Sequence, residues 1–148
     1  MQSSLCQFVI RQADLVRTRE AEAGYPGDGP TAAQIDALVE SFLEIDESSH
    51  SIPISVLSAA FHSSLEIEMS WLFPERDPIG RALLPVLRQV QNLTAAAIDE
   101  KLPGEKERLD ELVNMEVIAN AERRISAIRR NRPNLRLKLA LFMDSFRR

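Results

Sequence analysis

The chain has 148 residues, of which 45% are hydrophobic and 27% charged, and we expect one globular domain covering residues 1–148. The longest apolar runs fall short of the roughly 18 residues that a transmembrane helix needs, which argues against a membrane protein. The first residues also lack the basic start of a signal peptide. With one cysteine, Cys6, the chain cannot form an internal disulfide, so we expect a cytoplasmic protein.

The first helix is predicted near the start of the chain. Ser4 and Gln7 have the spacing of a capping box, in which two side chains satisfy free amides at a helix start. Apolar residues then follow at helical spacing up to Gly24, where the helix should end. Four of the six residues in 25–30 are glycine or proline, which predicts a loop.

Two further helices are predicted in the next part of the chain. Thr31 and Gln34 form a second capping box, followed by an apolar stripe that fades after Glu47. Pro53 suits the first position of a third helix. Apolar residues then line one face of this helix as far as Leu72.

The most regular apolar pattern lies between residues 78 and 101. Asp77 followed by Pro78 is a typical helix start, and Pro85 in the second turn should kink the helix. The stripe is formed by Ile79, Leu83, Val86, Val90, Leu93 and Ala97. Its alternating spacing of four and three residues makes it a candidate seam between two copies of the chain.

A fifth helix is predicted from Glu105 to about residue 131, before Pro133. Its apolar residues follow one another so closely that they point almost all round the helix. They are Val113, Met115, Val117, Ile118, Ala119 and Ala121. A helix of this kind is usually surrounded by others, so we expect a buried central helix over about residues 105–131.

The last segment fits two structures. Leucines alternate with other residues from Leu135 to Leu141, as in a strand, but Leu135, Leu139, Phe142 and Phe146 also keep helical spacing. A lone strand would have no pairing partner, so we predict a helix. The expected fold is therefore an all-α bundle of about six helices around the central one.

Three polar side chains interrupt the apolar run of the central helix: Asn114, Glu116 and Asn120. One interpretation is that they face solvent or a seam between helices. The other is a buried polar site that binds a small molecule or fixes helix register. If they are buried, each needs a hydrogen-bond partner, because an unsatisfied polar group costs about 1–3 kcal/mol.

Basic residues gather at the end of the chain. Residues 1–122 contain nine Lys and Arg against 21 Asp and Glu, whereas residues 123–148 contain nine against one. The candidate binding residues for a charged partner are Arg123, Arg124, Arg129, Arg130, Arg132, Arg136 and Lys138. They could pair with acidic helices of the same chain, with a protein partner or second copy, or with nucleic acid. The sequence pI of about 5.3 and the lack of interleaved aromatic residues disfavour nucleic acid.

No pattern for catalysis or metal binding is complete. Glu47 and His50 have metal-ligand spacing, but Ala59 stands where a second such pair would need an acidic residue before His62. Cys6 has no neighbouring histidine, and glycine loops for phosphate are absent. We therefore expect no catalytic residues, no metal and no cofactor.

The sequence favours a non-enzymatic protein–protein interaction or regulatory module that is homo-oligomeric, and we expect a homodimer. The first alternative is a nucleic-acid-associated regulator that uses the arginine-rich end. The second alternative is a helical bundle that binds a small molecule at the polar residues of the central helix.

Overall fold

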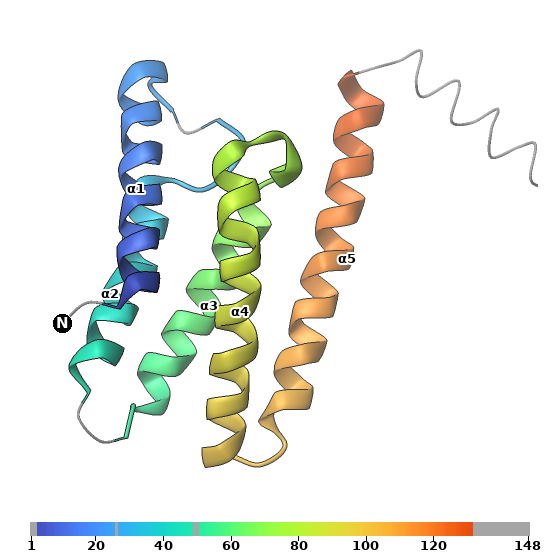
Figure 1. Ribbon diagram of the computed structural model, residues 1–148. Helices are drawn as coiled ribbons and strands as arrows, with labels where there is room; N and C mark the ends of the chain where they lie inside the picture. Colours follow the sequence, from blue (N-terminus) through green and yellow to red (C-terminus); the bar gives the residue numbers. More distant parts are fainter. Residues whose placement is uncertain (1–2, 26, 49–50, 132–148) are drawn as a thin grey trace, which may run out of the picture.

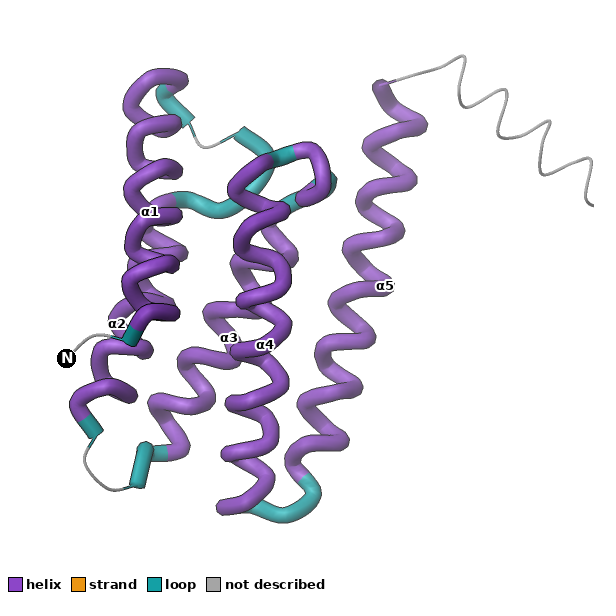
Figure 2. Tube along the Cα trace, viewed as in Figure 1, coloured by secondary structure: helices purple, strands orange, loops and turns teal. Residues whose placement is uncertain are grey.

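The protein is a bundle of α-helices, as Figures 1 and 2 show. The computed structural model describes residues 3–25, 27–48 and 51–131, and these contain helices and loops but no strand. The elements are α1 (Ser4–Ala23), α2 (Ala32–Glu47), α3 (Ile54–Ser70), the short 3-10 helix η1 (Pro74–Arg76), α4 (Pro78–Lys101) and α5 (Glu105–Asn131). The all-α prediction is confirmed. The helix expected at residues 135–146 lies outside the described residues.

Successive helices run in alternating directions. In Figure 1, α1 rises, α2 descends, α3 rises, α4 descends and α5 rises again. Each of α1–α2, α2–α3, α3–α4 and α4–α5 is a contacting pair, and α4 also packs on α1. α5 contacts only α3 and α4 extensively, so it lies at one edge of the bundle.

Local capping explains where the helices begin and end. The amide of Cys6 donates to Ser3 Oγ at 3.1 Å, so the cap of α1 is Ser3 and the predicted Ser4–Gln7 box is wrong by one residue. Gly24 ends α1 in the left-handed conformation, with φ 79°, as expected. The capping box of Thr31 and Gln34 at the start of α2 is confirmed.

Buried apolar residues form two clusters. The first core joins α1, α2, α3 and α4 and contains fully buried residues such as Val9, Leu38 and Leu83. The second core is smaller and lies between α3, α4 and the beginning of α5. It consists of Leu57, Phe61, Leu65, Met69, Ala95, Ile98 and Leu109. α3 therefore divides its apolar residues between the two cores.

The regular stripe of α4 faces mostly into the bundle. Ile79, Leu83 and Val90 are buried in the first core, whereas Leu93 is 59% exposed. Because these residues pack against the chain's own helices, they are not available as a seam between copies. Pro85 lies on the exposed side of α4, which continues unbroken from residue 78 to 101.

The predicted central position of residues 105–131 is wrong. In α5 only Leu109, Asn120 and Ala127 are buried, whereas Met115 is 68% and Ile118 61% exposed. The apolar run predicted a helix that is covered on every side. In the described part of the chain, α3 and α4 are the helices that pack extensively on α5. In a buried central helix, Val117→Asp would be strongly destabilising. In this structure the carboxylate would lie at the surface, because Val117 is 44% exposed.

Candidate interaction surfaces

The outer face of α5 carries a group of exposed apolar residues. Ile118 is nine residues from both Leu109 and Ala127, the buried positions on the bundle side, and nine residues correspond to a half-turn offset at about 100° per residue. We define the outer stripe as the exposed residues Met115, Val117, Ile118, Ala121 and Ile125. Grouped exposed apolar residues of this kind mark interaction sites more often than single ones do.

A groove runs between α3 and α5 on the side that α4 does not line. It encloses about 740 Å³ and has apolar walls formed by Leu65 and Met69 of α3 and by Leu112 and Ala119 of α5. Its other lining residues are Gln34, His62, Glu66, Ser70, Glu116 and Arg123. We call this the α3–α5 groove. A smaller hollow of about 290 Å³ shares His62 and Leu112 with it and continues toward the start of α5.

The upper part of α5 is fastened to the end of α3 by a polar contact. Asn120 is buried, and its Nδ2 donates to the Trp71 carbonyl at 3.2 Å. Arg123 Nη2 donates to the Met69 carbonyl at 2.9 Å and to Asn120 Oδ1 at 2.6 Å. These bonds satisfy carbonyls that the end of α3 leaves without a helical partner.

Arg124 makes a second, more exposed contact. Its Nη2 lies 2.7 Å from Glu75 Oε1, and its guanidinium carbon is 5.2 Å from the centre of the Phe73 ring. Arg76 stacks on the same ring at 4.0 Å. An ion pair this exposed contributes about 0–1 kcal/mol, so its main effect is to orient the end of α5.

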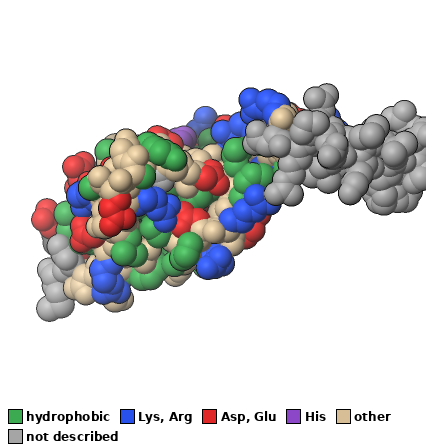
Figure 3. Space-filling model, turned by 90° about the horizontal axis from the view of Figure 1, so that it is seen from above, with side chains coloured by type: hydrophobic (Ala, Val, Ile, Leu, Met, Phe, Trp, Pro, Cys, Tyr) green, Lys and Arg blue, Asp and Glu red, His purple; other side chains and the backbone are tan. Residues whose placement is uncertain are grey.

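The candidate basic residues thus fall into three groups. Arg124 pairs with Glu75, as the interpretation of pairing within the chain expected, whereas Arg123 donates to the Met69 carbonyl and to Asn120 rather than to an acidic side chain. Arg129 and Arg130 are exposed in the last turn of α5 and form no ion pair with the part of the chain that the structure describes. Arg132, Arg136 and Lys138 lie outside the described residues. Figure 3 shows Lys and Arg side chains gathered beside the grey atoms at this end of the molecule.

The three polar residues of α5 are not brought together. Asn120 is buried and hydrogen-bonded, Glu116 is half-buried and lines the α3–α5 groove, and Asn114 is exposed. They therefore do not form the joint buried polar site that the sequence suggested. The predicted need for a hydrogen-bond partner holds for Asn120 alone, because only Asn120 is buried.

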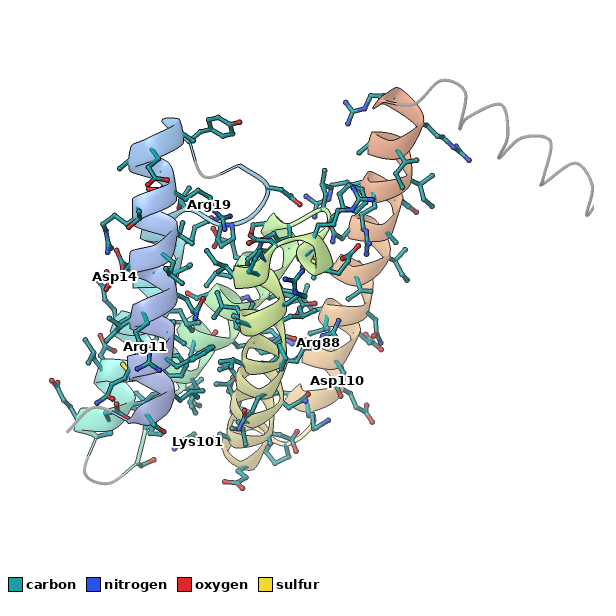
Figure 4. All side chains as sticks on the ribbon, turned by 45° about the horizontal axis from the view of Figure 1, so that its top comes forward. Arg11, Asp14, Arg19, Arg88, Lys101 and Asp110 are labelled. Carbon is teal, nitrogen blue, oxygen red and sulfur yellow. The ribbon has the colours of Figure 1, made fainter. Side chains whose placement is uncertain are left out.

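A polar junction at one end of the bundle was not evident from the sequence. Asp77 accepts two hydrogen bonds from Arg19, at 2.8 and 2.9 Å, and one each from Trp71 Nε1 and the Ile79 amide, at 3.0 Å. Figure 4 shows Arg19 reaching from α1 toward this end. Gly29 lies against the Trp71 indole so closely that a β-carbon there would overlap it. The sequence identified Asp77 only as a helix cap.

The environment of Asp77 determines its charge. Burial alone would raise its pKa, but the hydrogen bonds from Arg19, Trp71 and the Ile79 amide outweigh this and lower the pKa below the usual aspartate value. The same contact raises the pKa of Arg19. Both groups are therefore held in their charged forms, and their ion pair joins α1 to the start of α4.

Reactive groups are few in the described part of the chain. Cys6 is fully buried, and burial together with the nearby Asp46 raises its pKa, which is the opposite of a nucleophilic cysteine. Over residues 3–25, 27–48 and 51–131 no three His, Cys, Asp or Glu residues are grouped to hold a metal ion, and His50 lies outside these ranges. Within the same ranges, none of the helices is both long and apolar enough to cross a bilayer.

Comparison with known proteins gives no relative: no protein-family model, no curated protein and no solved structure matches the chain. Any functional inference therefore has to come from the surfaces described above.

Proposed function

We propose that this protein is a non-enzymatic interaction module that associates with a second copy of itself through the outer stripe of α5. The observation that carries the proposal is the concentration of exposed apolar residues on that face. Eight large hydrophobic residues are exposed in the described part of the chain, and four of them, Met115, Val117, Ile118 and Ile125, lie within 11 residues of α5. The others are scattered over α1, α4 and two loops, as single exposed residues commonly are.

The spacing within α5 supports a helix–helix contact. Ile118, Ala121, Ile125 and Ile128 follow each other at intervals of three, four and three residues, the pattern of a coiled-coil seam. Ala121 would allow a close approach of two helices between the larger isoleucines. Because two copies present the same stripe, pairing about a two-fold axis would bury both at once.

Polar residues also stand within the outer face of α5. Asn114, Glu122 and Arg129 are exposed there among the apolar residues, so a contact between two copies would include polar groups as well as apolar ones. The groups whose pKa is shifted, namely Cys6, Arg17, Arg19 and Asp77, lie on other elements and are buried or ion-paired, so they offer no support for catalysis at this face.

The decisive experiment is light scattering on the purified full chain over a micromolar concentration series. We expect a mass of twice 16.7 kDa for the wild type and 16.7 kDa for Ile118→Glu, because a charge would be buried in the seam. Leu93→Glu is the matched control, since Leu93 on α4 is 59% exposed and Ile118 61%. A single-chain mass for the wild type throughout, or equal loss of dimer in both variants, would refute the proposal.

The nucleic-acid alternative has one supporting observation. Arg129 and Arg130 are exposed at the end of α5 and form no ion pair within the described residues, so their charges are open to phosphate. Against this, the chain as a whole is acidic, with a sequence pI of about 5.3. We therefore keep this function second, and its test is given below.

A further inference from the structure

The α3–α5 groove is elongated along both of its helices. α3 and α5 run in the same direction, as Figure 1 shows, and the groove follows them from His62 and Leu112 at one end to Ser70 and Arg123 at the other. These ends are eight residues apart on α3 and 11 residues apart on α5, which corresponds to about 12–16 Å at a rise of about 1.5 Å per residue. The groove therefore has the length of about two to three helical turns.

Apolar side chains form most of the two walls. Leu65 and Met69 stand one turn apart on α3, and Leu112 and Ala119 stand two turns apart on α5. The described part of the chain contains no strand, so the groove has no sheet edge beside it that could pair with an extended peptide. Two parallel helices with apolar side chains between them suit a third, amphipathic helix instead.

The charges around the groove are mostly negative. The helices α2 and α3 contain seven carboxylates, five in α2 and two in α3, and neither helix contains a Lys or Arg. On the groove itself, Glu66 stands on the α3 wall and Glu116 on the α5 wall, and neither forms an ion pair with a described residue. Glu66 accepts a hydrogen bond from the neutral amide of Gln34 at 2.8 Å. Both walls therefore carry a carboxylate that lacks a cationic partner among the described residues.

The arginines at the two ends of the groove are directed elsewhere. Arg123, at the upper end, donates to the Met69 carbonyl and to Asn120. Arg108, which lines the adjoining smaller hollow, is paired with Glu105 at 2.6 Å. A molecule in the groove therefore meets carboxylates along both walls and a guanidinium only at the ends, which favours a basic occupant.

We propose that the α3–α5 groove binds an amphipathic helix of a partner protein, with an apolar stripe two to three turns long and Lys or Arg on both flanks. The apolar residues of the partner, at intervals of three and four, contact the apolar walls. Its basic residues pair with Glu66 on one side and Glu116 on the other. The apolar contacts supply most of the affinity, and the charges select the partner and speed its association.

This inference does not depend on the proposed function, because the two surfaces lie on different sides of α5. Ala119 lines the groove, whereas Ala121 belongs to the outer stripe, and both are exposed. On a helix these two positions are about 160° apart. The two alanines therefore provide a matched pair of sites, at which the same substitution adds the same charge to the chain.

The test titrates the full chain into a fluorescent synthetic peptide of about four turns, in which leucine recurs at intervals of three and four and the other positions are lysine and alanine. By anisotropy at about 150 mM salt we expect saturable binding, and none for a peptide with glutamate in place of each lysine. Ala119→Arg should weaken binding about tenfold or more, because the new side chain occupies the groove and repels the lysines. Ala121→Arg should change it by less than about twofold.

A second pair of variants tests the charges on the walls. Glu66→Gln combined with Glu116→Gln should weaken binding of the lysine peptide about fivefold or more, because both ion pairs are lost. Glu107→Gln combined with Glu122→Gln is the matched control, since these two carboxylates are exposed on α5 and do not line the groove. The control removes the same net charge and should change the affinity by less than about twofold.

Isotope labelling of the methionine methyl groups locates the bound peptide. We expect the lysine peptide to shift the Met69 methyl signal of the wild type, and to leave it unshifted in Ala119→Arg. No binding of the lysine peptide, equal binding of the two peptides, or equal effects within either pair of variants would overturn the proposal. A Met69 signal that shifts with protein concentration in the absence of peptide, but not in Ala119→Arg, would assign the groove to a second copy and would also overturn it.

Discussion

The first core and α5 both contain runs of apolar helix residues but use them differently. In the first core, Val9, Leu38 and Leu83 are fully enclosed by four helices. In α5, Met115 and Ile118 are mostly exposed although seven of the ten residues in 112–121 are apolar. An apolar helix face in a sequence therefore does not tell whether other helices of the same fold cover it.

The largest expected difference between these two regions is in the free energy of unfolding. Leu83→Ala should lower it by about 2–5 kcal/mol, since it leaves a cavity among fully packed neighbours. Ile118→Ala should change it by no more than about 0.5 kcal/mol for a single chain, because the side chain is 61% exposed. Urea denaturation at a dilution where light scattering shows monomer measures both. Similar losses in the two variants would mean that α5 is as much a part of the core as α4.

The second prediction concerns the polar junction that closes the first core. Asp77→Ala should lower the free energy of unfolding by about 2–4 kcal/mol at neutral pH, because Arg19 and the Trp71 indole lose their acceptor. The pKa of Asp77 is lowered by folding, so its stabilisation is fully present above the usual aspartate pKa, near 4, and is lost as the pH falls further. The difference in free energy of unfolding between Asp77→Ala and the wild type should therefore become smaller below about pH 4. Denaturation curves from pH 7 to pH 2 would show it, and a constant gap would contradict the assignment.

A smaller effect is expected where α5 is fastened. Asn120→Ala should cost about 1–2 kcal/mol, because the Trp71 carbonyl and Arg123 each lose a hydrogen-bond partner. The loss should be local. Hydrogen exchange of amides in α5 should become faster while amides of α1 and α2 keep their rates, since α5 opens without the first core. Uniformly faster exchange would show that the two regions unfold as one unit.

The smallest effect on stability is expected at the end of α5. Changing Arg129, Arg130 and Arg132 together to Ser should alter the free energy of unfolding by about 0.5 kcal/mol or less, as for ordinary surface substitutions. We also expect no binding of the wild type to random-sequence DNA or RNA at about 150 mM salt, where exposed charges are screened beyond about 8 Å. Fluorescence anisotropy measures this. Sub-micromolar binding that the triple variant loses would favour the nucleic-acid function.

Most of the fold could be predicted from the sequence because its signals are local. The Thr31–Gln34 box, the left-handed Gly24 and the Asp77–Pro78 start each depend on a few neighbouring residues, and each marks a helix end in the structure. The position of α5 could not be predicted in this way. Whether Val117 is covered depends on which helices stand beside it, and that is a property of the packing rather than of the pattern.

The candidate surfaces were predictable only in part. The grouping of arginines was visible in the sequence. Their division into engaged and exposed residues depends on Met69 and Glu75, which lie 54 residues from Arg123 and 49 residues from Arg124 along the chain. The α3–α5 groove gave no sequence signal, because it results from the separation of two helices. His62 and Glu66 would have been recognised as wall residues only once α5 was known to stand opposite α3.

The junction at Asp77 also bears on the order in which the protein takes shape during translation. Arg19 leaves the ribosome 58 residues ahead of Asp77, and at about 5–20 residues per second this delay lasts roughly 3–12 s. During that interval α2 and α3 emerge after α1, while Arg19 still lacks its acceptor and α1 still lacks α4, which packs against it in the folded chain. α5 is made after all of these, so it meets a completed platform. The early helices are therefore the part of the newborn chain that most needs protection from aggregation, and α5 needs it less than they do.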